Sequence, residues 1–174
     1  GYSYCEILKI TSKVPSLICG SSESLNSKIN FMIDFGYKKK EVLRLIKQGF
    51  PLTKLKEETI KNKLNFFISL GYTKEEIIHM SLYPILLCFS STHILNTFKF
   101  LKSIGYSEDN IRKMTCIFPS IYSFSIKYIL DKFNFLKGLG YTDNQVKDIT
   151  ISLPSIFGFS NKNLLDKIRY YKEI

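Results

Sequence analysis

The residue types that most often carry out catalysis or bind metals are few in this chain of 174 residues. Histidine occurs only at His79 and His93, and no Ser-His-Asp order, P-loop or HExxH motif is present. The Asp and Glu residues mostly fall at predicted helix starts, where they complement the helix dipole. The sequence therefore predicts a binding protein and not an enzyme, with no catalytic residue, no cofactor and no small-molecule substrate.

The four cysteines show no pattern typical of a metal site. Cys5, Cys19, Cys88 and Cys116 have no CxxC spacing and no His or Cys neighbour at zinc-ligand distance. Each lies among apolar residues. We therefore expect reduced, buried thiols in an intracellular protein, with no disulfide and no bound metal.

Basic residues are the most informative charged groups. The chain has 25 Lys and Arg against 15 Asp and Glu, a formal net charge of +10. Residues 1–87 carry 13 basic and 8 acidic residues, and residues 88–174 carry 12 and 7, so the charge is spread along the molecule. A distributed basic excess favours a long polyanionic partner. Compositional drift toward Lys, Ile, Asn, Phe and Tyr, as in an AT-rich genome, is the alternative explanation.

Several basic residues recur at a spacing of 34 or 35 residues. If equivalent positions stack side by side, each series forms a stripe of cations that can follow a phosphate backbone and release its counterions. The alternative is a solvated edge whose Lys stems cover neighbouring carbons. The three series are Lys9, Arg44, His79 and Lys113, broken by Asp148; Lys28, Lys63, Lys132 and Lys167, with Thr97 as the exception; and Lys102, Lys137 and Lys172. Arg112 and Arg169 are further candidates, because a guanidinium group suits bidentate phosphate or guanine contacts.

The spacing of these series comes from an internal repeat. Gly-Tyr pairs begin at residues 1, 36, 71, 105 and 140, and the prolines are at 15, 51, 84, 119 and 154. Self-similarity at this period is typical of a solenoid. We predict one array without linkers, made of repeats 1–35, 36–70, 71–104, 105–139 and 140–174.

Each repeat has the same predicted elements. A Ser or Thr after Gly-Tyr, with Glu or Gln three residues later, forms a capping box, as at Thr73 and Glu76. A first helix of about ten residues then ends at the proline, and an apolar 3₁₀ turn leads to a serine cap (Ser21, Ser90, Ser125 or Ser160). A second helix with apolar residues at steps of 4, 3 and 3 ends at the next glycine, in a left-handed cap. The predicted fold is an all-α superhelical solenoid with two helices and a short turn per repeat.

The second repeat departs from this pattern. Gly49 is an extra residue before Pro51, and LTKLKEE replaces the usual apolar turn. We expect an irregular turn in which Leu52 and Leu55 keep the packing.

The order of these elements resembles the mitochondrial transcription termination factor (mTERF) family over the whole chain. Apolar residues follow the proline by three, ten and seventeen positions, as in Pro84, Leu87, Ile94 and Leu101. Repeat two, with Lys54 and Lys61 at two of these positions, fits after a shift of one residue. The resemblance implies a curved α-solenoid with a basic groove, acting on organelle nucleic acid in transcription termination or initiation, ribosomal RNA and ribosome assembly, or intron splicing. It transfers no site residues.

Our main hypothesis is a nucleic-acid-binding repeat protein of a mitochondrion or plastid, with double-stranded DNA favoured over RNA and contacts along a basic groove. The alternative is a scaffold for an RNA-modifying or ribosomal protein partner, which an exposed apolar patch would favour. Apolar runs are too short for a membrane span. The chain begins without Met, as a fragment or processed product does, so a targeting signal is not observable.

Overall fold

The computed structural model describes residues 3–48, 50, 52, 55–83 and 85–173. Sequence features at Gly1, Tyr2, Gly49, Pro51, Lys54, Pro84 and Ile174 lie outside these residues, as does the side chain of Lys172. All regular secondary structure in the described residues is helical, which confirms the predicted all-α repeat fold. No described helix has the length and apolar character needed to cross a membrane.

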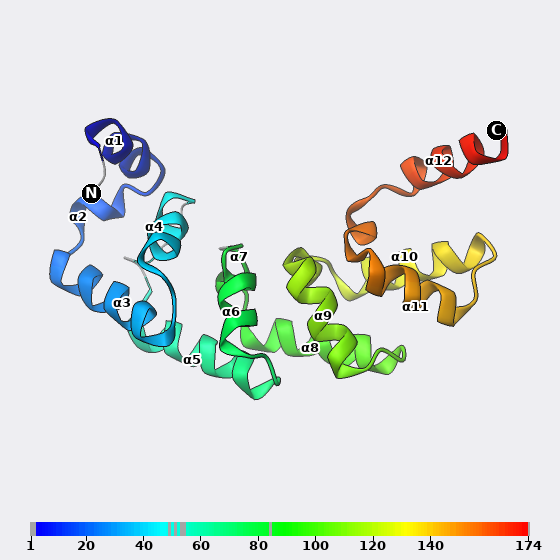
Figure 1. The fold of residues 1–174 in the computed structure, drawn as a ribbon, viewed down its shortest axis with the longest axis horizontal. Helices are drawn as coiled ribbons and strands as arrows, with labels where there is room; N and C mark the ends of the chain where they lie inside the picture. The colour runs from blue at the N-terminus through cyan, green and yellow to red at the C-terminus, as the bar shows by residue number, and fades with distance from the viewer. Residues whose placement is uncertain (1–2, 49, 51, 53–54, 84, 174) are drawn as a thin grey trace. The chain divides into compact units, whose positions relative to one another are not determined.

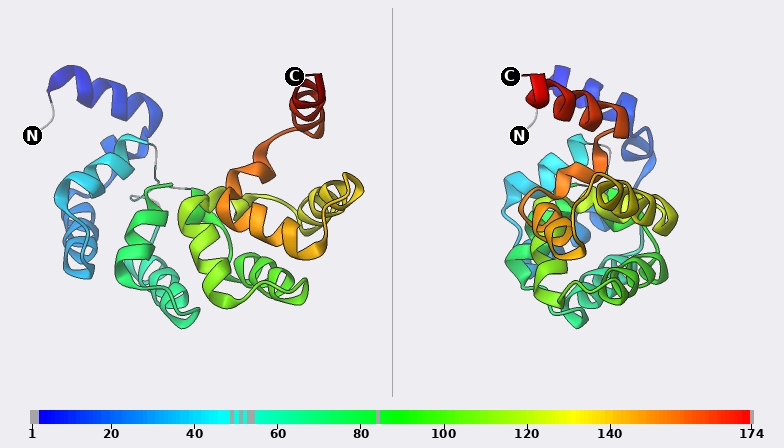
Figure 2. Two further views of the ribbon diagram at one scale, coloured as in Figure 1. Left: turned by 45° about the vertical axis from the view of Figure 1, so that its right-hand side comes forward. Right: turned by 90° about the vertical axis from the view of Figure 1, so that its right-hand side faces the viewer.

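The chain divides into two compact units, Gly1–Ser91 and Thr92–Ile174, and each is described by itself. Figure 1 labels the helices, and Figure 2 shows them from two further directions. The first unit contains α1 (Tyr4–Lys13), α2 (Ser16–Cys19), α3 (Ser22–Phe35), α4 (Lys39–Lys47), α5 (Glu57–Ser69), α6 (Lys74–Ser81) and α7 (Ile85–Cys88). Helix α8 (Ser91–Ser103) begins at the boundary, and the second unit continues with α9 (Glu108–Ile117), η1 (Pro119–Ser123), α10 (Ile126–Gly138), α11 (Asp143–Ser152), η2 (Pro154–Gly158) and α12 (Asn161–Glu173). The five repeat boundaries and the single array stay predictions.

The first helices of the repeats begin where the capping boxes predict. The hydroxyl of Thr73 accepts a hydrogen bond from the amide of Glu76 at 3.2 Å, and the Glu76 carboxylate accepts one from the Thr73 amide at 2.8 Å. Reciprocal pairs of this kind satisfy amides that have no partner within the helix. Ser3 with Glu6 and Thr142 with Gln145 repeat the arrangement. Lys38 has no such hydroxyl, and only its own amide is bonded, to Glu41.

The second helices end at glycines in the left-handed region, as predicted. Gly36, Gly71, Gly105 and Gly140 have φ of 132°, 86°, 93° and 100°. A residue with a Cβ is strained there, so glycine fixes the turn into the next repeat. The tyrosine after Gly71 packs back on the helix: the ring of Tyr72 meets that of Phe67 edge-on, with centroids 5.7 Å apart.

The turn between the two helices takes two forms. It is a 3₁₀ helix in the fourth and fifth repeats, at η1 and η2, as predicted. In the first and third repeats it is a single turn of α-helix, α2 and α7. The two forms differ by one residue in the span of a hydrogen bond, so similar apolar segments can adopt either. In the second repeat Leu52 is buried and Leu55 half-buried.

Successive repeats are joined by two kinds of helix packing and by hydrogen bonds. Three second helices pack on the first helix that follows them: α3 on α4, α5 on α6, and α10 on α11. Helices in equivalent places also pack together, α3 with α5 and α9 with α11. Two buried tyrosines connect a repeat to the next one by hydrogen bonds of 2.6 Å between hydroxyl groups, Tyr37 with Ser81 and Tyr106 with Thr150. Burial raises the pKa of both phenols to about 12.

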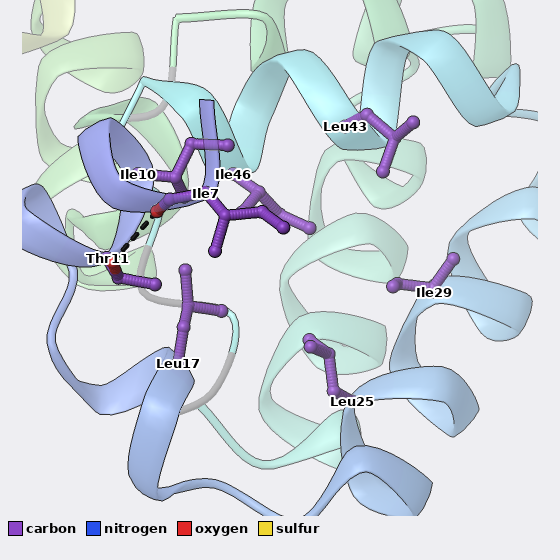
Figure 3. A pocket seen from close by; sticks show the side chains of 8 residues that line it. All are labelled: Ile7, Ile10, Thr11, Leu17, Leu25, Ile29, Leu43 and Ile46. Atoms are coloured by element: carbon purple, nitrogen blue, oxygen red, sulfur yellow. Dashed lines mark hydrogen bonds between the residues drawn. The ribbon is translucent and has the colours of Figure 1, made fainter. Parts of the chain in front are cut away.

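The first unit contains an apolar cavity that involves the first repeat. The cavity measures about 200 Å³ and lies among α1, α2, α3 and α4. Figure 3 shows its side chains, of which Thr11 donates to the carbonyl of Ile7 at 2.8 Å. Its lining is almost entirely aliphatic: Ile7, Ile10, Thr11, Leu17, Leu25, Ile29, Leu43 and Ile46.

Candidate nucleic-acid interface

The second-helix lysines that were predicted to form a cation stripe are turned into the protein. Lys28, Lys63 and Lys132 are only 3% to 8% exposed. Each ammonium group donates to the turn of the next repeat: Lys28 to the Leu52 carbonyl at 3.2 Å, Lys63 to the Phe89 carbonyl, and Lys132 to the Phe159 carbonyl at 2.5 Å. A lysine held in this way joins two repeats, and its charge does not face solvent.

The surroundings of these ammonium groups support a structural role. Lys63 also donates to the hydroxyl of Ser91 at 3.2 Å, and Lys132 to the side-chain oxygen of Asn161 at 2.6 Å. The ring centroids of Tyr128 and Phe135 lie 5.8 and 5.7 Å from the Lys132 nitrogen, within cation–π range. Burial lowers the pKa of Lys63 and Lys132, because it disfavours the charged form.

At Thr97, the exception in the second-helix series, a different side chain makes the hydrogen bond to the next turn. Thr97 is too short to reach the next turn, and its buried hydroxyl has no hydrogen-bond partner among the described residues. One turn earlier, Nε2 of His93 lies 2.7 Å from the Tyr122 carbonyl. Tyr128, in the equivalent place of the next repeat, donates to the Phe157 carbonyl at 2.9 Å. Donors from a second helix to the next turn are therefore a recurring feature of the fold.

Lys167, the last member of the series, is exposed. Its nitrogen lies 5.9 Å from the ring centroid of Phe159, in its own repeat. It is the member of this series whose charge stays available to a partner.

The first-helix series remains on the surface. Lys9, Arg44, His79 and Lys113 are all exposed. Lys9, Arg44 and Lys113 form no ion pair with another described residue. Cations without a carboxylate partner are the groups most able to contact phosphate.

In the first unit these cations are part of a larger basic surface between α1 and α4. A hollow of about 310 Å³ there is lined by Lys9, Lys13 and Lys47 with Glu6 and Ile10. Lys47 pairs with Glu6 at 2.6 Å and, together with bonds from Ser3, lowers the pKa of that carboxyl to about 2. Three ammonium groups face one carboxylate, so the hollow is cationic.

We call Lys9, Lys13, Lys40, Arg44 and Lys47 the α1–α4 basic surface. Lys9 and Lys13 are one turn apart on α1, and Lys40, Arg44 and Lys47 follow at steps of four and three on one side of α4. Lys13, Lys40 and Lys47 were missing from the predicted site. Their signal is the helical spacing within each helix, which a comparison of equivalent places in different repeats does not detect.

The remaining predicted cations are paired with acids. Lys102 pairs with Glu108, and Lys137 with Asp143 at 2.7 Å. Arg112 contacts Asp109 and lies 3.8 Å from Glu108, and Arg169 lies 3.9 Å from Asp166. Exposed pairs of this kind are weak, so the cations can exchange partners. Their carboxylates nevertheless reduce the local attraction for an anion.

The equivalent region of the second unit is polar without being basic. A hollow of about 370 Å³ between α9 and α11 is lined by Asn110, Asn144, Lys147 and Asp148, with Gly105 and Ile151. The positive charge of Lys147 is balanced by the negative charge of Asp148 in this hollow. The strongest concentration of unpaired positive charge on the first helices is therefore in the first unit.

The prediction of buried cysteines is wrong for three of the four. Cys5, Cys19 and Cys88 are exposed and Cys116 is half-buried, and none of the four forms a disulfide with another described residue. Cys5 occupies a place that holds Lys40, Glu75, Asp109 and Asn144 in other repeats, so its position in the repeat was a better guide than its apolar neighbours. No three His, Cys, Asp or Glu side chains gather into a potential metal site within the described ranges.

Comparison with known proteins gives one family match. The family model named mTERF matches residues 1–82 and 80–137, which is most of the chain. No curated protein matches the sequence.

Proposed function

Because the chain belongs to the mTERF family, a family of nucleic-acid-binding helical-repeat proteins associated with organelles, we propose that it binds organelle nucleic acid through the α1–α4 basic surface. The partner we propose first is double-stranded DNA, with RNA as the alternative, and the process is transcription termination or a ribosomal RNA function. The chain acts by binding, without catalysis.

The observation that carries this proposal is the exposed first-helix series. Lys9, Lys13 and Arg44 lie on two adjacent first-helix elements of one compact unit, and none is ion-paired with a described residue. Ammonium and guanidinium groups on a helical scaffold contact phosphates without reading bases. Lys113 and Lys167 are additional exposed contacts in the second unit.

The test compares two triple variants with the same loss of charge. In the first, Lys9, Lys13 and Arg44 are changed to Gln. In the control, the exposed second-helix residues Lys61, Lys99 and Lys162 are changed to Gln. Fluorescence anisotropy with labelled duplex DNA, single-stranded DNA and structured RNA gives affinity at several salt concentrations.

We expect the first triple variant to weaken binding for all sequences and to reduce the slope of log affinity against log salt by about one per lost contact. The control should change both quantities much less. Equal effects of the two variants would mean that only net charge matters and that the α1–α4 basic surface is not the interface. Absence of binding to all three ligands at low salt would reject the proposed function.

One observation favours the protein-scaffold alternative as a second candidate. Large apolar side chains are exposed inside the described chain, near the ends of three first helices: Tyr83, Ile117 and Leu153. A chain that binds no nucleic acid but binds a ribosomal or RNA-modifying protein through these residues would support this candidate.

A further inference from the structure

The first-helix series contains one residue whose charge depends on pH. In the first unit, Lys9, Arg44 and His79 occupy equivalent places on α1, α4 and α6, three successive first helices (Figure 1). All three side chains are exposed. Lysine and arginine stay cationic near neutral pH, whereas imidazole groups ordinarily change their charge between about pH 5 and about pH 8. The third cation of this series is therefore present only when the imidazole is protonated.

A hollow between α4 and α6 places His79 in the same surroundings as two carboxylates. The hollow measures about 250 Å³ and is lined by Lys38, Glu41, Glu75 and His79, with Gly36, Ile78 and Leu82. When the imidazole is neutral, one ammonium group faces two carboxylates, and the hollow repels phosphate. When the imidazole is protonated, the two positive charges balance the two negative ones.

The imidazole of His79 is available to a ligand. It forms no ion pair and no hydrogen bond with another described residue. The Glu41 carboxylate accepts a hydrogen bond from the Lys38 amide at 2.8 Å, which holds this carboxylate at the start of α4. Glu75 is exposed, one turn before His79 on α6. The charges that face His79 in the first unit are therefore those of Lys38, Glu41 and Glu75.

The other elements that pack on α6 in the first unit are α5 and α7, and no charged residue of either lines the hollow. Lys63 of α5 donates to the Phe89 carbonyl and interacts electrostatically with Cys88 of α7. Glu57, at the start of α5, accepts a hydrogen bond from the Ser27 hydroxyl at 2.7 Å. These groups are held by other partners, so protonation of His79 sets the change in charge of this hollow near neutral pH.

The neighbouring hollow between α1 and α4 does not change in this way. Lys9, Lys13 and Lys47 line it with a single carboxylate, Glu6, which hydrogen bonds from Lys47 and Ser3 keep ionised near neutral pH. The α1–α4 basic surface therefore stays cationic, and only its continuation onto α6 depends on pH.

We propose that protonation of His79 extends the α1–α4 basic surface onto α6, so that the first unit binds nucleic acid more strongly as pH falls. This inference rests on the proposed function. The added contact is to a phosphate and reads no base, because a protonated imidazole in this place takes the role of Lys9 and Arg44 on the preceding helices.

Fluorescence anisotropy with labelled duplex DNA, at constant ionic strength from about pH 5.5 to about pH 8, tests this inference. We expect the affinity of the wild type to increase about two- to fivefold toward the lower pH. The slope of log affinity against log salt should become steeper by up to about one. Circular dichroism checks that the chain is folded at each pH.

Two variants of His79 and one of His93 identify the group responsible. His79→Gln should remove the increase, and His79→Lys should give the higher affinity over the whole pH range. His93→Gln is the matched control, because His93 is the second of the two histidines and its Nε2 lies 2.7 Å from the Tyr122 carbonyl. This control should keep the pH dependence of the wild type.

The outcomes separate this inference from the proposed function. Binding that does not change with pH, or an increase that His79→Gln retains, would overturn the inference and leave the proposed function intact. The same holds if His93→Gln removes the increase and His79→Gln does not. Absence of binding at every pH would reject both.

Discussion

Changing Lys132 to Met tests whether the second-helix lysines join repeats or contact a partner. The variant keeps most of the apolar stem and removes two hydrogen bonds, to the Phe159 carbonyl and to the Asn161 side chain. Loss of a charge-assisted hydrogen bond of this kind costs about 1.5–3 kcal/mol of stability when its acceptor finds neither water nor another donor. Phe159 and Asn161 are exposed, so water can replace part of these hydrogen bonds in the variant. The variant also avoids the free-energy cost of removing the ammonium group from water on folding. We therefore expect a net loss of about 1–2 kcal/mol.

Lys167→Met is the control for this prediction, because it makes the same chemical change in an exposed member of the series. It should change stability by less than about 0.5 kcal/mol. Thermal and urea unfolding followed by circular dichroism give both values; repeat arrays can unfold in parts, so the two curves should be compared over their full range. For a chain of this length, the Lys132 variant should lower Tm by about 2–8 °C.

The nucleic-acid affinity of the same two variants completes the test. We expect Lys132→Met to keep the affinity of the wild type under conditions where it is folded, since its ammonium group faces the next turn. The reasoning is refuted if Lys132→Met has wild-type stability and loses as much affinity as Lys167→Met. That result would mean that the Lys132 ammonium group reaches a phosphate.

Two further predictions concern buried hydroxyl groups. Tyr37 and Tyr106 have pKa values of about 12 in the folded chain and about 10 in the unfolded chain. The unfolded chain therefore loses these protons first, and the free energy of unfolding falls by about 2–3 kcal/mol for each tyrosine as pH rises from 10 to 12. Urea midpoints across this range should fall less steeply when both are changed to Phe; an unchanged slope would contradict the assignment. Thr97→Val removes an unpaired buried hydroxyl and should stabilise the chain by about 0.5–1 kcal/mol, whereas Thr150→Val removes a bonded one and should cost about 1–2 kcal/mol. Urea unfolding of the pair checks both, and stabilisation by Thr150→Val would refute the distinction.

The helix boundaries could be predicted because they depend on local chemistry. The hydroxyl of Thr73 and the carboxylate of Glu76 bond to nearby amides, so four adjacent residues determine the start of α6. Gly105 ends α8 because its φ of 93° strains other residues. These interactions do not require knowledge of the next repeat. A single sequence therefore contains enough information to predict these helix boundaries.

The function of the second-helix lysines could not be predicted in the same way, because it depends on a distant carbonyl. The spacing did contain a signal. Lys132 is three residues after Ile129 and four before Leu136, which places it within the apolar face. A lysine at such a place extends its stem along the core and its ammonium group to the nearest acceptor. The acceptor, Phe159, is 27 residues away. Only the packing of the next repeat identifies it.

The exceptions show which property of this series the fold requires. In α8 the lysine is replaced by Thr97, and a histidine one turn earlier makes the bond to the next turn, through the Tyr122 carbonyl. In α10 both places carry donors, Tyr128 and Lys132. The common property is a hydrogen-bond donor long enough to reach the next turn, with or without a positive charge. A series of lysines in a helical repeat is therefore evidence for a nucleic-acid interface only where the residues lie outside the apolar face, as Lys9, Arg44 and Lys113 do.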